Sequence, residues 1–369
     1  MKINYLRRWN EIRENLGEND AFVCSLPGNT RYLANSESPP GCPPGSTMNY
    51  IVIPSKGEPI AITSSLEEHR CRKESSIKDI RLWTHYPDIK SDGKTAKEVL
   101  KNALNERNIT QICSDSKLSL GRNVKSTQNH FITEMRGVKS PDELERIRKA
   151  IKQSDKGQEF ARNLVECGKG LTEREVRSEI DYFMARNGIQ ENSFSTIIAS
   201  GPNSAHSHHS NTNRKLKDGD SVICDFGVFW DGYCSDITRT YFVGGETTKE
   251  LKEVYQIVLE ANKRSINALT EGNTGHKIDK AGRDYIRDKN YGRNFVHGTG
   301  HGFGLEIHEF PSLTYKSKIT AKQSMSVTIE PGIYIPGKGG VRIEDDVLVN
   351  GNEPEVLTKA KKDFIDDGS

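Results

Sequence analysis

The sequence predicts an α+β protein of two domains, a smaller α/β N-terminal domain at residues 1–136 and a C-terminal domain at residues 137–369. Three observations lead to this prediction. A chain of 369 residues is typical of two domains, each with its own core. Strand-like and helix-like segments alternate in the N-terminal part, as they do in α/β layers. The order helix, strand, hairpin then occurs twice, at residues 172–243 and 277–349, which indicates two related halves.

In the N-terminal domain, short apolar runs bounded by turn residues predict strands, and amphipathic runs predict helices. The predicted strands lie at 21–24, 80–83 and 111–114. Two further strands, at 48–53 and 59–63, are predicted to form a hairpin with its turn at 55–58. The predicted helices lie at 66–73 and 95–104. Residues 38–45 are rich in proline and glycine and predict an irregular loop. This domain shows no arrangement of residues typical of catalysis.

Helix starts in the C-terminal domain carry Ser or Thr followed three residues later by Glu, the pattern of a capping box. The pairs are Ser140 with Glu143, Thr172 with Glu175, and Thr247 with Glu250. Pro141 suits the first turn of the first of these helices. A further helix is predicted at 277–288, and strands are predicted at 194–199, 325–329 and 341–349.

The composition excludes several classes of protein. The chain has 53 basic and 51 acidic residues without a long block of one sign, which argues against a nucleic-acid partner and a polybasic membrane anchor. Residues 1–8 lack the apolar core of a signal peptide, and no apolar run is long enough to span a bilayer. The seven cysteines are scattered and form no CxxC motif. We therefore expect a cytoplasmic protein with free thiols and no membrane partner.

A hairpin in the C-terminal domain brings two acids together. The dipeptide Asp231-Gly232 suits the positive φ angles of a two-residue hairpin turn. A turn centred there places Asp236 opposite Gly227, and Asp225 lies two residues from Gly227 on the same face. Two carboxylates so placed repel each other unless a cation lies between them. The alternative is an edge hairpin whose acids are solvated.

Three further groups able to bind a metal follow in the second half. His301 lies in a segment, 297–304, in which every second residue from Gly298 is glycine, and this spacing lets the backbone approach another surface closely. Glu330 ends an apolar strand before a Pro-Gly turn, and Glu344 shares a strand face with Arg342. Taken singly, each has an ordinary alternative, a polar histidine or an ion-paired surface glutamate.

Together these residues form a consistent ligand set. Asp225, Asp236, Glu330 and Glu344 supply four negative charges, and His301 supplies one neutral nitrogen. Two divalent cations would neutralise the charges. Oxygen-rich ligation with one imidazole suits Mn²⁺, Co²⁺, Fe²⁺ or Zn²⁺. Two such ions about 3.5–4 Å apart could share one water molecule and activate it as a nucleophile.

Several motifs carry a resemblance to a known family. They are Asp-Phe-Gly from 225, Ser-Asp-Ile-Thr-Arg-Thr at 235–240, Gly-His-Gly-Phe-Gly-Leu-Glu-Ile-His-Glu at 300–309, Thr-Ile-Glu-Pro-Gly-Ile-Tyr at 328–334, and Val-Arg-Ile-Glu-Asp at 341–345. The chain resembles the pita-bread metallopeptidases (family M24), most closely Xaa-Pro dipeptidases (prolidases) and Xaa-Pro aminopeptidases. The resemblance is strong from residue 140 onward. It is weaker before it, where Asn-Thr-Arg-Tyr-Leu at 29–33 resembles the creatinase-like N-terminal domain.

The resemblance implies a pita-bread catalytic domain and a role for each ligand. Asp225 would hold one metal ion, and His301 and Glu330 would hold the other. Asp236 and Glu344 would bridge both ions. Glu330 would also carry a proton from the bridging water to the leaving amine.

The resemblance also implies substrate contacts. His308 would stabilise the tetrahedral oxyanion, His297 would contact substrate near P1′, and Arg342 would orient substrate or a ligand carboxylate. His208 matches the upstream substrate-binding histidine, although Ser207 stands where many members have proline and two more histidines, His206 and His209, lie beside it. The implied substrate is a peptide or dipeptide with proline at P1′, and the implied assembly is a homodimer.

Two alternatives remain open beside an Xaa-Pro peptidase. One is a metal-dependent hydrolase or lyase of another small amide or osmolyte, since the same fold hosts several reactions. The other is a non-catalytic binding protein on this scaffold, which the presence of all five ligands disfavours. The motifs fit an Xaa-Pro dipeptidase and an Xaa-Pro aminopeptidase equally.

Overall fold

The computed structural model describes residues 3–18, 20–35, 47–121 and 124–362. The chain divides into two compact units, Met1–Arg136 and Gly137–Ser369. The loop predicted at 38–45 lies outside the described residues. Among the described residues, no helix is both long and apolar enough to cross a membrane.

The first unit is built on a mixed six-stranded sheet in the order β4-β3-β2-β1-β5-β6. Its strands are β1 (Asp20–Cys24), β2 (Met48–Pro54), β3 (Ile60–Ser64), β4 (Asp79–Trp83), β5 (Gln111–Ser114) and β6 (Lys125–Gln128). Its helices are α1 (Tyr5–Arg13), α2 (Pro27–Ala34), α3 (Glu68–Glu74), α4 (Ala96–Glu106) and α5 (Phe131–Gly137), the last of which ends in the second unit. The predicted hairpin is confirmed, since β2 pairs antiparallel with β3 and Gly57 takes a φ of 90° in the turn. The sequence patterns had not indicated α1, α2, α5 or β6.

The second unit consists of two halves with matching strands. The first half contains α6 (Pro141–Glu166), α7 (Glu173–Arg186), β7 (Glu191–Asn192), β8 (Ile197–Ser200), β9 (Ser221–Phe226), β10 (Val228–Trp230), β11 (Tyr233–Cys234) and β12 (Ile237–Phe242). The second contains α8 (Lys249–Ala268), α9 (Gly275–Asp288), β13 (Gly300–Gly302), β14 (Glu309–Leu313), β15 (Ser326–Ile329), β16 (Gly332–Ile335), β17 (Gly339–Arg342), β18 (Asp345–Leu348) and β19 (Glu355–Val356).

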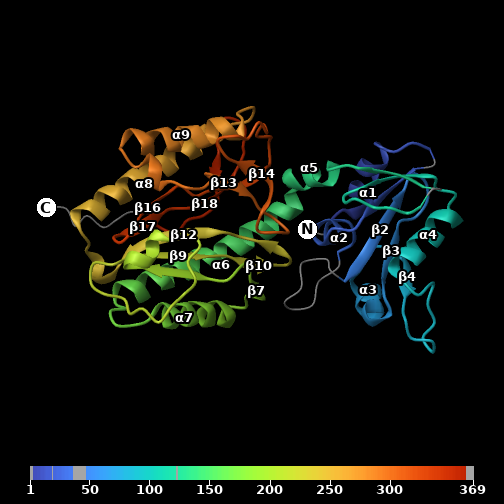
Figure 1. Ribbon diagram of the computed structural model, residues 1–369, viewed down its shortest axis with the longest axis horizontal. Coiled ribbons are helices and arrows are strands. Elements are labelled where there is room, and N and C mark those ends of the chain that lie inside the picture. Colours follow the sequence, from blue (N-terminus) through green and yellow to red (C-terminus); the bar gives the residue numbers. More distant parts are fainter. Residues whose placement is uncertain (1–2, 19, 36–46, 122–123, 363–369) are drawn as a thin grey trace. The chain divides into compact units, whose positions relative to one another are not determined.

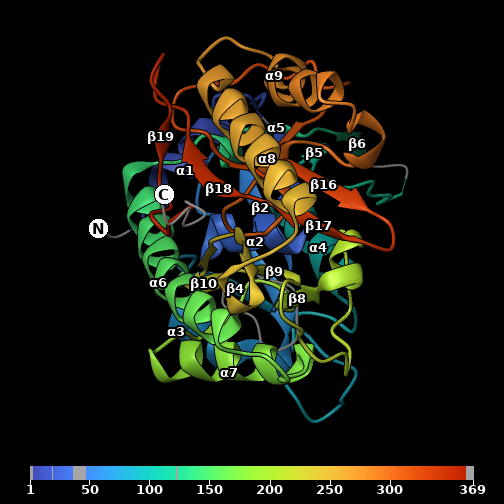
Figure 2. The ribbon, with the colours of Figure 1, turned by 90° about the vertical axis from the view of Figure 1, so that its left-hand side faces the viewer.

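The correspondence between the halves is visible in the strand order. The sheet β12-β9-β8 matches the run β18-β15-β13 of a five-stranded sheet. In each half an antiparallel pair, β9 with β12 or β15 with β18, is interrupted by a smaller hairpin, β10 with β11 or β16 with β17. Helices α6 and α7 cover the strands on one side, and α8 and α9 cover them on the other (Figures 1 and 2). The predicted pair of related halves is therefore confirmed.

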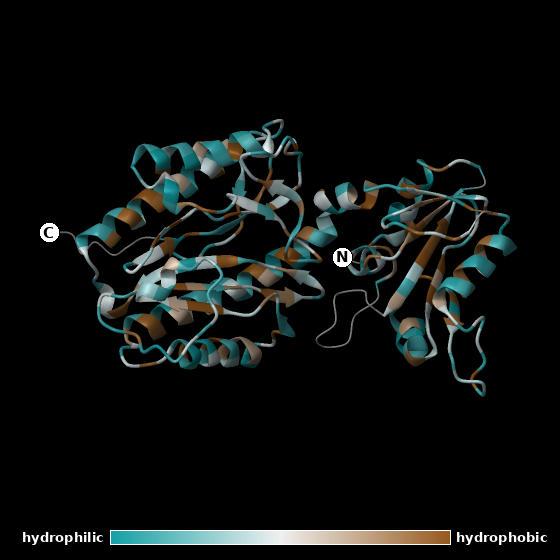
Figure 3. Cartoon of the chain, viewed as in Figure 1, coloured by the Kyte–Doolittle hydropathy of each residue, from teal (hydrophilic) through white to brown (hydrophobic). Residues whose placement is uncertain are grey.

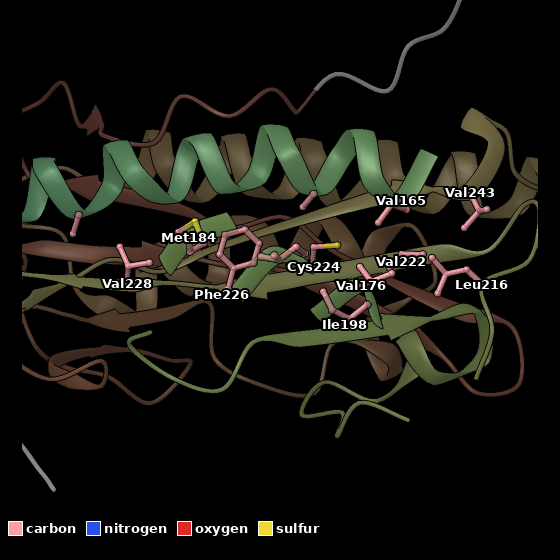
Figure 4. Packing of buried hydrophobic residues seen from close by; sticks show 13 residues of the cluster. Val165, Val176, Met184, Ile198, Leu216, Val222, Cys224, Phe226, Val228 and Val243 are labelled. Atoms are coloured by element: carbon pink, nitrogen blue, oxygen red, sulfur yellow. The ribbon is translucent and has the colours of Figure 1, made fainter. Parts of the chain in front are cut away.

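Each half has its own hydrophobic core between its helices and strands. In the first half, Val222, Cys224 and Phe226 of β9 pack with Val176 and Met184 of α7 (Figure 4). In the second half, apolar residues of α8 pack against the hairpin of β16 and β17 and the following residue, including Val254, Val258, Ile333, Val341 and Ile343. Apolar residues concentrate on the strands, while the helices carry hydrophilic residues as well (Figure 3).

Two of the three predicted capping boxes are present. The backbone N–H of Ser140 donates to Glu143 Oε2 at 2.9 Å, and that of Thr172 donates to Glu175 Oε2 at 2.7 Å. The third prediction is wrong by one residue. The N-cap of α8 is Thr248, whose hydroxyl accepts from the N–H of Leu251, whereas the Thr247 hydroxyl donates to the carbonyl of Gly219. Adjacent threonines cannot be told apart from the pattern alone, because either can begin the helix.

The strand predicted at 341–349 is also corrected. It is split into β17 and β18, with Ile343 and Glu344 between them. The split occurs because β17 pairs with β16, whereas β18 pairs with β15, so the chain passes from one sheet to another. Continuous apolar alternation does not reveal such a change of partner. As a result Glu344 lies at a junction between sheets and not in the middle of a strand.

The predicted register of the first hairpin is confirmed. Asp231 and Gly232 take φ angles of 47° and 81°, as the tight turn requires. Pairing of Phe226 with Ile237 and of Asp225 with Thr238 continues the same register into β9 and β12. Asp225 and Asp236 therefore lie on one face of the hairpin, as alternation along the strands requires.

Candidate metal centre and substrate pocket

Four acids occupy equivalent places in the two halves. Asp225 lies near the end of β9 and Glu330 directly follows β15, while Asp236 directly precedes β12 and Glu344 directly precedes β18. Hydrogen bonds join the halves here, since the N–H of Glu344 donates to the carbonyl of Thr238 at 3.1 Å. The pseudo-symmetric strand pairs thus bring two acids from each half to one place.

His301 is placed among these acids by its glycine neighbours. A Cβ on Gly300 would lie 1.9 Å from the carbonyl oxygen of Thr328, and one on Gly302 would lie 2.2 Å from that of Phe310. Only glycine allows this approach of β13 to its neighbours. The Nδ1 of His301 donates to the Gly302 carbonyl at 3.1 Å, so Nε2 keeps its lone pair. The histidine is therefore in the tautomer that a metal ligand requires.

The lone pair of His301 Nε2 faces carboxylates. It lies 3.7 Å from Asp236 Oδ2 and 3.6 Å from Glu330 Oε1. One ligand atom each of Asp236, His301 and Glu344 lies within 4.8 Å of the others. Asp225 joins them in the lining of one cavity of about 300 Å³. The structure thus brings together all five residues predicted as ligands.

Arg342, which pairs with Asp225, balances only part of the negative charge of the cluster. Burial, and then the charges of Glu344 and Asp225, raises the pKa of Asp236 well above its usual range. Burial likewise raises the pKa of Glu344, with Glu330 and Asp225 adding to the shift. Burial raises the pKa of Glu330 to about 8 against the opposing charge of Arg342. Acids in such a site ionise readily only when a cation is present.

Asp225 provides an independent test of whether a metal ion fits. Its Oδ2 accepts a hydrogen bond from Arg342 Nη2 at 2.5 Å. Its Oδ1 is buried and has no hydrogen-bond partner among the described residues. A buried carboxylate oxygen without a partner is costly, and coordination of a cation would remove the cost. With a histidine nitrogen and further carboxylates beside it, the donor set fits a divalent metal ion.

The three histidines predicted to serve the substrate line the same cavity, namely His208, His297 and His308. The His308 ring lies 4.3 Å from that of His301, centroid to centroid. Burial, and then the neighbouring His208, lowers the pKa of His308, so its imidazole is neutral near pH 7 and still carries one N–H. His208 and His308 are exposed. Both can therefore reach a bound molecule.

His297 is held more tightly than the other two. Its Nδ1 donates to the Gly298 carbonyl at 2.8 Å, and its Nε2 accepts from the Tyr334 hydroxyl at 2.8 Å. Burial and the charge of Arg342 lower the pKa of His297 to about 4. Its predicted contact with substrate near P1′ stays a prediction.

The sequence analysis did not single out Tyr334 and Thr238. The Tyr334 hydroxyl accepts from Arg342 Nη1 at 2.9 Å, while the Thr238 hydroxyl accepts from Arg342 Nε at 3.1 Å and donates to Glu344 Oε2 at 2.6 Å. Thr238 could have been found, because it lies two residues from Asp236 and so shares its strand face. Nothing local indicates Tyr334, which reaches this place only through the fold.

The upstream histidines have separate surroundings. His208 lines the cavity, whereas the Nε2 of His209 lies 2.8 Å from Glu173 Oε2 in a network away from the acids. His206 is exposed and does not line the cavity. Of the three neighbouring histidines, the one predicted to meet substrate is the one that the fold directs toward the acid cluster.

The sequence is similar to those of known metallopeptidases. Residues 145–351 match the sequence profile of metallopeptidase family M24. The chain is 42% identical to an Xaa-Pro dipeptidase of Pyrococcus furiosus over 234 residues, which cover 63% of this chain and 66% of that protein, just under two thirds. It is 34% identical to an uncharacterized peptidase of Staphylococcus aureus over 345 residues, which cover 93% of this chain and 95% of that protein.

Solved structures resemble the whole fold. An Xaa-Pro dipeptidase from Bacillus anthracis superposes with a TM-score of 0.85 at 32% identity and covers 98% of this chain and 99% of that one. An X-Pro aminopeptidase from Thermotoga maritima superposes with a TM-score of 0.84 at 30% identity and covers 97% and 98%. These matches confirm the predicted fold, an N-terminal domain followed by a pita-bread domain. The chain belongs to metallopeptidase family M24.

Proposed function

We propose that this protein is a metal-dependent peptidase that hydrolyses Xaa-Pro bonds and acts on peptides or dipeptides with proline at P1′. The observation that carries the proposal is the single cavity that holds all five candidate ligands together with His208, His297 and His308. A binding protein has no need to keep a complete ligand set beside three histidines. The relatives that act on Xaa-Pro substrates by their names support the same choice.

The residues fit two divalent ions, which we propose to be Mn²⁺, Co²⁺, Fe²⁺ or Zn²⁺. Asp225 would hold one ion, His301 and Glu330 the other, and Asp236 and Glu344 would lie between them. When bound, the ions would polarise the scissile carbonyl and lower the pKa of a water molecule. The orphaned Asp225 Oδ1 and the raised pKa values of the other acids support this assignment.

The protein's own groups would move the protons. Glu330 would take a proton from the attacking water and give it to the leaving amine, and its place beside His301 in the cavity supports this role. His308, neutral near pH 7, would donate its N–H to the oxygen on which negative charge develops. His208 and His297 would position the substrate, and Arg342 would orient it or a ligand carboxylate.

The second unit would carry catalysis, since every residue of the site belongs to it. We propose that the protein is cytoplasmic, in agreement with the free thiols of its described cysteines, and that it forms a homodimer. Light scattering after size-exclusion chromatography measures the assembly directly. A mass equal to that of one chain would contradict the dimer.

The function is tested by loading the protein with Mn²⁺ or Co²⁺ and supplying an Xaa-Pro dipeptide, a longer Xaa-Pro peptide and a dipeptide without proline. We expect hydrolysis of proline-containing substrates and little hydrolysis of the control. A stoichiometric metal content without hydrolysis of any peptide would instead favour a metal-dependent enzyme of another small amide or osmolyte. Absence of bound metal would favour a binding protein.

A further inference from the structure

A second cavity adjoins the candidate active site. It has a volume of about 760 Å³ and shares Phe194, Ile197 and His208 with the lining of the first. Its remaining wall comes from residues 174–181 of α7, including Asp181, from Ser195 and Thr196, and from residues 209–211 after His208. We name it the outer cavity. Because three residues line both spaces, a molecule bound at the acid cluster could extend into the outer cavity.

The two cavities differ in charge. The inner one is lined by four carboxylates, and Arg342 is the only arginine or lysine among the described residues that line it. Every nitrogen of Arg342 already donates, Nε to Thr238, Nη1 to Tyr334 and Ser207, and Nη2 to Asp225. The inner cavity therefore offers a substrate carboxylate no arginine nitrogen that is still free to donate.

The outer cavity carries more positive charge, because Arg174 and Arg177 both line it beside one acid, Asp181. Arg174 is partly engaged, since it donates to the Asn211 carbonyl and to Asn213 Oδ1. Arg177 donates through Nε to Asp181 Oδ2 at 3.1 Å, and its side chain is 41% exposed. No hydrogen bond to the terminal nitrogens of Arg177 occurs within the part of the chain described. Those nitrogens can receive a carboxylate.

We propose that the outer cavity binds the part of a peptide substrate that continues beyond the proline residue, with Arg177 pairing with its carboxylate. The proposal rests on the function proposed above and extends it, because it makes peptides longer than two residues the preferred substrates. The amino end would lie at the acid cluster, the proline near His208, and the following residues along α7. Arg177 is then a residue that determines specificity and takes no part in the chemical step.

The experiment compares Ala-Pro with Ala-Pro-Ala and Ala-Pro-Ala-Ala, each longer peptide as the free acid and as the C-terminal amide. Each added residue moves the carboxylate by about 3.5 Å, so the series scans the outer cavity. We expect the free acid of at least one longer peptide to be cleaved with a higher kcat/KM than its amide and than Ala-Pro. Arg177→Gln should lower kcat/KM for the longer free acids about two- to five-fold, through a higher KM. It should leave kcat/KM for the amides unchanged.

Arg186→Gln is the matched control, because Arg186 is an exposed arginine of the same helix that does not line the cavity. It should behave as the unaltered protein. Equal cleavage of acids and amides at every length, or equal loss on all substrates in Arg177→Gln, would overturn the proposal while leaving the peptidase function intact. A protein that cleaves no Xaa-Pro peptide at all would instead contradict the proposed function.

A different observation assigns a role to Glu173, at the start of α7. Its side chain is 0% exposed, and both oxygens accept several hydrogen bonds. Oε1 accepts from the N–H and hydroxyl of Ser200 at 2.9 and 2.7 Å and from Asn203 Nδ2 at 3.0 Å. Oε2 accepts from the N–H and hydroxyl of Thr212 at 2.8 and 2.7 Å and lies 2.8 Å from His209 Nε2. One carboxylate thus holds both ends of the segment 200–212.

The segment held in this way carries His208 into the candidate active site. Burial alone would raise the pKa of Glu173, but its hydrogen bonds, that from Thr212 foremost, outweigh burial and lower the pKa to about 2. The carboxylate is therefore ionised throughout the physiological range, and its acceptor geometry does not change with pH. We infer that Glu173 is a positioning residue that orients His208 toward the substrate.

Glu173→Gln replaces an oxygen that accepts three hydrogen bonds by an amide nitrogen that donates. We expect kcat/KM for Xaa-Pro peptides to fall about ten- to a hundred-fold, since small displacements of a substrate-binding group have effects of this size. Metal content should be unchanged, and Glu173→Asp should recover part of the loss. When His208 is already replaced by Gln, adding Glu173→Gln should cause no further fall of this size in kcat/KM.

Glu175→Gln is the control for charge and helix capping, because Glu175 lies in the same turn but bonds only to Thr172. It should lower stability slightly and leave KM unchanged. If Glu173→Gln does not fold, Thr212→Val removes one of the six hydrogen bonds and should give a smaller change in the same direction. Unaltered kinetics in a folded variant, or losses that add fully to those of His208→Gln, would overturn the inference.

Discussion

The Nη2 of Arg342 and the Oδ2 of Asp225 lie 2.5 Å apart, although 117 positions separate the two residues in the chain. Both side chains are nearly buried, at 4% and 11% exposure. The guanidinium donates a hydrogen bond to Oδ2 of Asp225, while Oδ1 has no hydrogen-bond partner among the described residues. Arg342 thus orients the free Oδ1 of Asp225, and through Thr238 it also reaches Glu344.

Replacing Arg342 by lysine should therefore weaken metal binding. Lysine keeps the charge but cannot contact Asp225, Thr238 and Tyr334 at once. We expect the affinity for Mn²⁺ or Co²⁺ to fall about 10- to 100-fold, as for other residues that orient metal ligands. Competition with a chelating dye measures the affinity. Arg146→Lys, at the ion pair with the exposed Asp231, is the control and should leave the affinity unchanged. A change in KM alone would favour the predicted contact of Arg342 with substrate.

Asp236→Asn should abolish hydrolysis and lower the metal content, because it removes a charge placed between the two proposed ions. Elemental analysis and a peptide hydrolysis assay report the two effects separately. Asp231→Asn is the matched control, since Asp231 is 57% exposed at the turn of the same hairpin. Full activity of Asp236→Asn would contradict a site with two metal ions.

His308→Ala should lower kcat more than it lowers metal occupancy, because the imidazole is expected to act on the substrate oxygen and not on the metal. Loss of one such donor typically costs about 10²–10³ in kcat. Occupancy is measured on the same preparation by elemental analysis. His276→Ala changes an exposed histidine that lies outside the cavity and serves as the control. Loss of metal from His308→Ala would make His308 a ligand.

The metal-free protein should lose stability as the pH rises from 7 to 8. Burial raises the pKa of Glu330 to about 8, so the folded chain holds a proton there that the unfolded chain has released. Burial and the neighbouring acids shift the pKa values of Asp236 and Glu344 in the same direction. The proton on Glu330 lowers the free energy of unfolding by about 1.4 kcal/mol per pH unit until the group ionises.

The histidines do not cancel this trend. The pKa values of His297 and His301 are lowered to about 4, so above pH 7 both rings are neutral in the folded chain and almost neutral in the unfolded one. Thermal unfolding of chelator-treated protein at pH 7 and pH 8 tests the prediction. Protein loaded with metal should show a smaller change, because the ion replaces the protons. Stability of the metal-free protein that rises with pH would contradict the raised pKa values.

The elements most accurately predicted from the sequence depend on neighbouring residues. The capping boxes at Ser140 and Thr172 and the hairpin turn at Asp231 are satisfied within a few positions of the chain. The break between β17 and β18 was not predicted, because the change of partner strand depends on where β15 and β16 lie. Helix α2 and strand β14 were not predicted for a different reason, because their sequences lack a strong apolar period.

By itself, the sequence indicated the family and the five candidate ligands through its motifs. It also determined the hairpin register, since alternation along a strand and the demands of a tight turn act locally. Only the tertiary structure decided how the ligands are held. Tyr334, Thr238 and Glu173 act through partners on other strands and loops, and no periodicity in the sequence encodes such pairs. Likewise, packing of two matching halves decided that Asp225 and Glu330, 105 positions apart, would line one cavity.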